Sequence, residues 1–284
     1  MIDAAPVILC GFLRGEHQAF TGSSNLELVG GVIRLNGNSS GYSGTVTSTQ
    51  GRVDVTGTLG GNLIVTSFAA SLGGKGTISG NLELGAIAGP PLGTTMVVDS
   101  AAAGNLHVGG NVTVTNATTI KLTTAPAASS TLLTYGGTLT GGSNFDLEGG
   151  IGNYRAGTSI DTATTGVVKL NYVTGSVTWN GGAAGAWSSL GAGWVGGDTF
   201  RPFDNATFDN TVTPGAVTIA GNLGAGTITV NNSTGTTYSI NATSGNTISA
   251  GSFVKNGTGT CRRLFKSGFL ACSKADILLE SESA

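Results

Sequence analysis

Short runs of alternating apolar and polar residues, separated by glycine, recur along most of this chain. The pattern is clearest in three stretches: GRVDVTGTLGGNLIVTS (51–67), GKGTISGNLELGA (74–86) and GNLHVGGNVTVTNATTIKLTT (104–124). Each stretch places two or three apolar residues at alternate positions, then Gly or Gly-Asn, then the next apolar pair. Because successive side chains of a β-strand point to opposite faces, this alternation predicts short strands with one face in a core.

Strands this short favour a coil in which each strand stacks on its counterpart one turn away, at the roughly 4.8 Å spacing of any β-sheet. Helical periodicity is absent between residues 18 and 260. The sequence therefore predicts an all-β solenoid with irregular rungs. The same alternation places His107 on the solvent face. The residues expected to point inward include Leu63, Val65, Leu82, Leu84, Val112, Val114, Val217 and Ile219.

Glycine pairs stand between the predicted strands. Glycine adopts positive φ without steric cost, so such pairs predict corners with left-handed backbone. The pairs are Gly30-Gly31, Gly60-Gly61, Gly73-Gly74, Gly109-Gly110 and Gly136-Gly137.

The composition supports a folded but unusual chain. Glycine accounts for 49 of 284 residues, charged residues for 10%, and the net charge is −2. The regular apolar pairs argue against disorder, and glycine does not recur at every third position as in collagen. No basic face is available for nucleic acid. No segment approaches the roughly 20 apolar residues of a membrane span, so we expect no membrane insertion by this chain itself.

The pattern divides the chain into three parts. An irregular N-terminal segment (1–19) precedes the solenoid (20–260), which contains an aromatic spacer at 176–214, and a non-repeat tail (261–284) follows.

The tail is expected to leave the coil near Thr260. In a further coil, Arg262 and Arg263 would take the positions of the inward-pointing apolar residues, which we call the core row. Desolvating an unpaired charge there costs several kcal/mol. KADILLESES (274–283) predicts a short helix. The alternative is that the tail is a native capping element, because solenoids need polar ends.

The aromatic spacer holds all three tryptophans, Trp179, Trp187 and Trp194, together with three phenylalanines. These rings predict either a protruding loop or cap whose aromatics pack on one another and on the coil, or an exposed platform that binds carbohydrate.

Three carboxylates lie within twelve residues of the same spacer: Asp198, Asp204 and Asp209. Paired carboxylates in a groove can act as the acid and the base or nucleophile of polysaccharide cleavage. Carboxylate and amide oxygens can also bind a hard cation. Asp-Asn turns that cap strand ends are the alternative. The candidate ligand-binding residues are therefore Trp179, Trp187, Trp194, Asp204 and Asp209.

Catalytic signatures are otherwise lacking in the sequence. The sequence contains two histidines, His17 and His107, but no G-x-S-x-G motif whose serine a histidine could activate. No Cys/His cluster has metal-ligand spacing. We assign no catalytic, cofactor or metal site and expect no enzymatic activity.

Several motifs occur in an order that resembles a known family. GYSGTVTSTQGRVDV (41–55) and SLGGKGTISGNLEL (71–84) are similar to the two halves of the autotransporter-associated β-strand repeat. The Trp-containing segment 177–211 resembles the spacer between repeat blocks, and VKNGTGT (254–260) resembles the start of another repeat. The chain thus resembles the passenger region of bacterial autotransporters over about residues 20–260.

This resemblance implies a right-handed parallel β-helix that a C-terminal β-barrel secretes through the outer membrane and exposes on the cell surface. It implies host or environmental glycans, or surface proteins, as partners. The chain departs from the family pattern in three ways. No basic residue precedes the apolar run at 4–13, no barrel strands follow, and the repeat breaks off at Thr260.

We therefore expect a structural surface-display or adhesin-like module without catalysis. One alternative is a carbohydrate-binding or carbohydrate-active β-helix that uses the aromatic and acidic patch at 179–209. Another is an incomplete passenger fragment without function.

Overall fold

The computed structural model describes residues 7–10, 19–66, 69–86, 93–99, 104–181, 184–242, 245–264 and 277–279. This part of the chain is nearly all β, with three short 3₁₀ turns, and its parallel strands stack as a β-solenoid of about ten turns. The all-β solenoid prediction is confirmed. None of the helices in these ranges has the length and apolarity that a membrane span requires.

Contacts within the chain divide it into two compact units. The N-terminal unit comprises Met1–Thr123, Ala127–Ile151 and Thr158–Asn171. The C-terminal unit comprises Thr124–Pro126, Gly152–Gly157 and Tyr172–Ala284.

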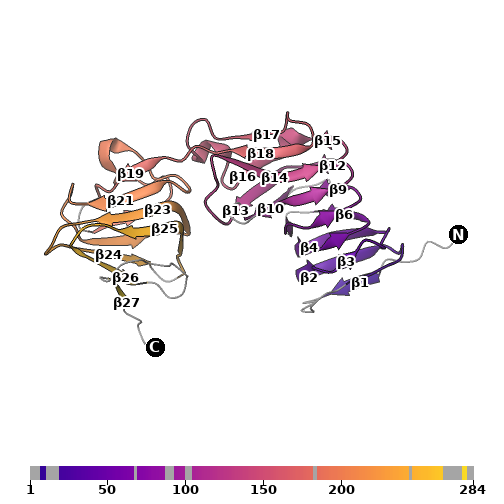
Figure 1. Ribbon diagram of the computed structural model, residues 1–284, viewed down its shortest axis with the longest axis horizontal. Helices are drawn as coiled ribbons and strands as arrows, with labels where there is room; N and C mark the ends of the chain where they lie inside the picture. The colour runs from indigo at the N-terminus through magenta and orange to yellow at the C-terminus, as the bar shows by residue number, and fades with distance from the viewer. Residues whose placement is uncertain are drawn as a thin grey trace. The chain divides into compact units, whose positions relative to one another are not determined.

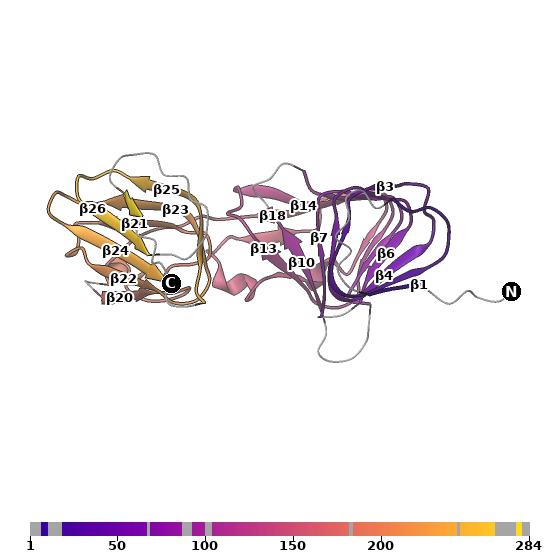
Figure 2. The same cartoon turned by 90° about the horizontal axis from the view of Figure 1, so that it is seen from below.

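Each coil of the N-terminal unit has three sides, which follow one another along the chain (Figure 2). The first side consists of β1 (Val7–Cys10), the first halves of β2 (Leu26–Leu35) and β4 (Thr45–Val55), then β6 (Asn62–Val65), β9 (Leu82–Leu84), β12 (Val112–Val114) and β15 (Leu139–Thr140). The second side consists of the second halves of β2 and β4, then β7 (Ala70–Gly73), β10 (Thr94–Val98), β13 (Thr118–Leu122) and β16 (Phe145–Leu147). The third side consists of β3 (Asn38–Ser39), β5 (Thr58–Leu59), β8 (Thr77–Ile78), β11 (Leu106–Val108) and β14 (Ser129–Tyr135).

This unit ends in an antiparallel hairpin rather than another parallel coil. β18 (Val167–Asn171) pairs antiparallel with β14, and β17 (Ser159–Asp161) pairs antiparallel with β18. Val168 and Leu170 are buried on the side of the core. The hairpin thus supplies partners to the last strand of the third side (Figure 1). Two of the 3₁₀ turns, η1 (Gly142–Asn144) and η2 (Ile151–Asn153), flank β16.

The C-terminal unit is a second parallel stack. One sheet has the order β19 (Ser176–Thr178), β21 (Asn205–Asp209), β23 (Leu223–Asn231), β25 (Ile248–Lys255). The other has the order β20 (Ala184–Trp187), β22 (Ala216–Ile219), β24 (Thr237–Ala242), β26 (Thr260–Leu264), β27 (Ile277–Leu279).

The predicted core row is confirmed. All eight residues named above from alternation are at most 2% exposed, and like side chains stack between coils, as Leu63 does on Leu82 and Leu82 on Val112. Burying one aliphatic side chain contributes about 1.5–3 kcal/mol, so these rows are a main stabilising contribution. His107 is exposed, as expected, and its Nδ1 lies 2.9 Å from the Thr134 hydroxyl of the next coil.

The predicted end of the coil at Thr260 is wrong. β26 continues the stack to Leu264 and pairs with β24, so that Cys261 lies beside Tyr238 and is fully buried. Arg262 follows on the outer face and is exposed. The alternation therefore places a cysteine, and not Arg262, in the core row. The side chain of Arg263 lies outside the described residues.

The predicted helix at 274–283 is also wrong where the structure describes it, because Ile277–Leu279 forms β27 and pairs with β26. The rest of that segment, and all of the N-terminal segment (1–19) except β1 and residue 19, lie outside the described residues.

Glycine has a different role from the predicted one at most of the corners. Gly30, Gly31 and Gly74 do adopt positive φ. The pairs Gly60-Gly61, Gly109-Gly110 and Gly136-Gly137 do not, so conformational freedom does not explain them.

Close approach between coils explains these glycines instead. Asn62 Oδ1 accepts a 2.8 Å hydrogen bond from the backbone N–H of Asn81, and Asn81 Oδ1 accepts one of the same length from Asn111 N–H. Asn111 continues the series to Thr138 N–H at 2.9 Å. These three bonds form an asparagine ladder along one corner of the N-terminal unit.

A glycine precedes each residue that donates to the ladder. A Cβ atom on Gly80, Gly110 or Gly137 would lie less than 3.0 Å from the asparagine oxygen of the coil before it. The missing side chain therefore leaves the space that the asparagine of the previous coil fills, which accounts for the recurring Gly-Asn motif.

Replacing one of these glycines should destabilise the fold. In Gly80→Ala the added Cβ would lie 2.5 Å from Asn62 Oδ1, and we expect the free energy of unfolding to fall by about 1–3 kcal/mol. Urea unfolding followed by circular dichroism measures this. Gly152→Ala is the control, because its Cβ would meet nothing within 4 Å and its φ is not positive. Equal effects of the two substitutions would contradict the steric role of Gly80.

Candidate functional site

The aromatic spacer forms the start of the C-terminal unit. It runs through β19 and β20, a 3₁₀ turn η3 (Val195–Gly197) and β21. Trp179, Trp187 and Trp194 are exposed by 0%, 0% and 2%. Their rings pack on one another and on two phenylalanines, with Trp179–Trp194 and Trp187–Phe200 centroids 5.1 Å apart and Trp179–Phe208 centroids 5.7 Å apart.

These rings form a core cluster together with the inward residues of β22, β23 and β24. Each buried tryptophan ring contributes about 4–6 kcal/mol of apolar burial. The buried indole nitrogens of Trp187 and Trp194 lack a hydrogen-bond partner, which costs about 1–3 kcal/mol each. Ring burial outweighs that cost. The faces of all three rings are covered by protein, so they offer no exposed platform on which a sugar could stack.

Asp204 is fully buried and belongs to a cluster of charges in the C-terminal unit. Both of its carboxylate oxygens accept hydrogen bonds from the Arg155 guanidinium, at 2.7–3.1 Å. The backbone N–H groups of Gly175 and Arg201 donate to the same carboxylate at 2.8 and 2.9 Å.

Arg155 joins a second carboxylate to this cluster. Its Nη1 donates to both oxygens of Asp198, at 2.9 and 3.0 Å, and its Nη2 donates to the carbonyl of Thr199 at 3.1 Å. The hydrogen bonds from Arg155 lower the pKa of the Asp198 carboxyl, and those from the two carboxylates raise the pKa of Arg155. The cluster ties the segment at 152–157 to the loop before β21.

Asp209 lies apart from this cluster in its contacts. Its Oδ1 accepts a 2.8 Å hydrogen bond from Thr211 N–H, which is an Asx turn, and its carbonyl accepts from the buried Tyr238 hydroxyl at 2.7 Å. Asp209 therefore has the turn-forming role that the sequence analysis gave as the alternative to catalysis or cation binding. Among the described residues, no group of three or more His, Cys, Asp or Glu side chains could hold a metal ion.

The sequence analysis identified the three carboxylates but missed Arg155, the partner of Asp198 and Asp204. Arg155 lies 49 residues before Asp204, in a segment with no repeat pattern, so no local signal connects the two. The structure shows that Asp198 and Asp204 share one guanidinium, which donates hydrogen bonds to both carboxylates.

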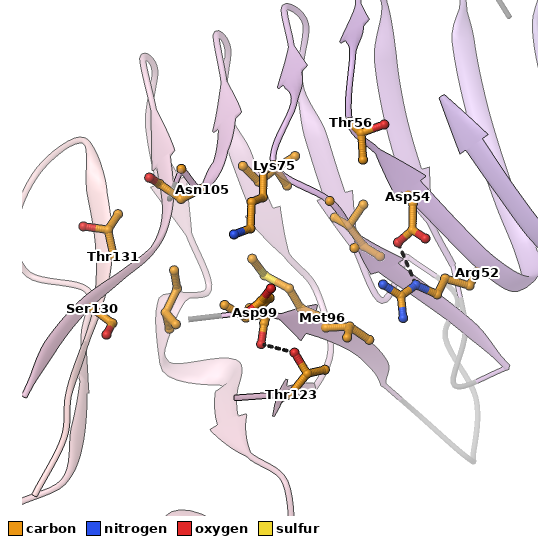
Figure 3. Close-up of a pocket in the computed structure, with 18 of the residues that line it drawn as sticks. Arg52, Asp54, Thr56, Lys75, Met96, Asp99, Asn105, Thr123, Ser130 and Thr131 are labelled. Carbon is orange, nitrogen blue, oxygen red and sulfur yellow. Dashed lines mark hydrogen bonds and ion pairs between the residues drawn. The ribbon is translucent and has the colours of Figure 1, made fainter. Parts of the chain in front are cut away.

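The N-terminal unit contains a cavity of about 650 Å³ where its second and third sides meet (Figure 3). Its lining was not predicted, since the residues come from four coils and share no motif. They include two basic and two acidic side chains, several hydroxyls and an apolar part. The polar side chains that Figure 3 labels are Arg52, Asp54, Thr56, Lys75, Asp99, Asn105, Thr123, Ser130 and Thr131.

Comparisons with protein-family models, with curated proteins and with solved structures find no match to this chain.

Removing Arg155 should destabilise the C-terminal unit. Arg155→Met leaves Asp204 as a buried, uncompensated charge, and we expect a loss of about 3–5 kcal/mol in the free energy of unfolding. Tryptophan fluorescence during urea unfolding measures it, because all three tryptophans lie in this unit. The double variant Arg155→Met/Asp204→Leu should recover part of the loss. Arg262→Met, which removes an exposed cation of the same unit, should change stability by less than about 0.5 kcal/mol.

Acid should weaken the same unit. The pKa of Asp198 is lower in the folded state than in the unfolded state, so its contribution is present above the ordinary pKa of about 3.9 and disappears as the pH falls through the lower folded value. The urea concentration at the unfolding midpoint, followed by tryptophan fluorescence, should therefore decrease when the pH is lowered below about 4. Asp198→Asn should show a shallower acid dependence, and an unchanged dependence would contradict this role.

Proposed function

We propose that this chain is a non-catalytic β-solenoid module for surface display, of the autotransporter passenger type. The observation that carries the proposal is the stacking of parallel coils, which keeps apolar side chains inside and leaves Thr, Ser and Asn on the outer faces. In such a fold each coil contacts mainly its neighbours, so it can form progressively as the chain emerges from a secretion pore.

Two further features support this function. The 250 residues from 11 to 260 contain no cysteine, so no early disulfide could lock the body of the chain before export. The carboxylates that could have served catalysis are held in structural contacts, Asp198 and Asp204 by Arg155 and Asp209 by its turn.

Export to the cell surface tests the proposal. The full chain would be placed between a signal peptide and an autotransporter β-barrel in a Gram-negative host, and external protease added to intact cells should digest it. The same fusion without the signal peptide should stay protected. A passenger that remains in the periplasm, although its barrel is inserted, would overturn the display function.

The purified chain should show no cleavage of polysaccharides or peptides above background. Reducing-sugar release and unsaturated-product absorbance over a panel of polysaccharides measure this, and a peptide library covers proteolysis. Turnover that is abolished by Asp209→Asn, a substitution confined to a turn, would favour the carbohydrate-active alternative instead.

A further inference from the structure

The cavity of the N-terminal unit lies at a corner whose connections differ in length between coils. Between β7 and β8 the second and third sides are joined by three residues, 74–76. Between β10 and β11 the connection has seven residues, 99–105, and between β13 and β14 it has six, 123–128. The lining of the cavity comes from four successive coils at this corner.

The charges in the lining balance each other. Arg52 Nε donates to Asp54 Oδ1 at 2.6 Å, and Asp54 is 7% exposed. This pair lies against Gly73, where a Cβ atom would be less than 3.0 Å from both partners. Lys75 and Asp99 add one more charge of each sign. With two cations and two carboxylates, the cavity has no net charge with which to attract an ion.

The other polar groups in the lining both donate and accept hydrogen bonds. They are the hydroxyls of Thr56, Thr123, Ser129 and Thr131 and the amide of Asn105. Met96 and Val97 supply apolar surface beside them. A sugar has the matching chemistry, since each of its hydroxyls donates and accepts at once and its C–H groups need an apolar contact. Ionised side chains of both signs strengthen such bonds.

From these observations we propose that the corner cavity binds a small, uncharged polyhydroxy compound, namely a mono- or disaccharide. A volume of about 650 Å³ lies within the usual range of small-molecule sites. The proposal is independent of the display function and does not involve the buried tryptophans of the C-terminal unit.

Calorimetry on the full chain tests this site with neutral sugars and with charged derivatives of glucose. Glucose, N-acetylglucosamine and maltose should bind saturably, with at least one dissociation constant in the millimolar range, since the lining residues that the structure describes include no aromatic ring. Glucosamine and glucose 6-phosphate should bind at least several-fold more weakly than glucose. A tenfold rise in NaCl should change neutral-sugar affinity less than twofold.

Two variants connect binding to the cavity. Ala127→Trp places a large ring at an exposed position of the lining and should abolish binding, whereas Ala163→Trp, the same change in an exposed loop of the same unit, should not. Thr131→Val keeps the shape, removes one hydroxyl and should weaken binding about threefold to tenfold. Thr113→Val, on β12 outside the lining, should leave it unchanged.

Three results would overturn the proposal. These are no saturable binding of any of the neutral sugars, preferential salt-sensitive binding of a charged analogue, and sugar binding that survives Ala127→Trp in a variant with an unchanged circular dichroism spectrum.

Discussion

The contact between an asparagine side chain of one coil and the backbone of the next sets the geometry of the solenoid. Asn62, Asn81 and Asn111 each satisfy a corner N–H group that no strand pairs, and each does so in space left by a glycine. The C-terminal unit also contains this arrangement, since Asn205 Oδ1 accepts from Thr227 N–H beside Gly226. Because buried or half-buried backbone groups need partners, these bonds supply the partners that the backbone lacks at this corner.

The start of the C-terminal unit is held together by different interactions. There the backbone follows long connections without a repeat, and side chains replace the ladder as the organising contacts. The aromatic cluster fills the interior, while Arg155 ties two segments that are distant in sequence. A lone carboxylate such as Asp204 could not be buried at this place without its cation, because desolvation of one charge costs several kcal/mol. The segment in which the sequence repeat is interrupted is thus stabilised by specific side-chain contacts, namely the aromatic cluster and the Arg155 ion pairs.

The parts of this fold that follow from local pattern could be predicted, and the parts that depend on partners in other coils could not. Alternation alone identified the inward residues, such as Leu63 and Val217, because strand geometry determines which side chains share a face. The steric role of Gly80 depends on Asn62, which lies in the preceding coil, so its sequence neighbours suggested only backbone freedom. The prediction for the tail was wrong by one residue of register, since Cys261 and not Arg262 points into the core, beside Tyr238. The cavity, whose lining comes from several coils, left no signal at all.

The asparagine ladder also has a polarity. Each side-chain oxygen accepts from the coil that follows it in the chain, never from the one before, in all three bonds of the series. Each coil of the series therefore presents an oriented acceptor to the coil that follows it in the chain. A coil added on the C-terminal side of the series therefore meets a side-chain acceptor, whereas a coil added on the N-terminal side meets a backbone donor. The repeated Gly-Asn pair thus makes the two directions along the stack chemically different.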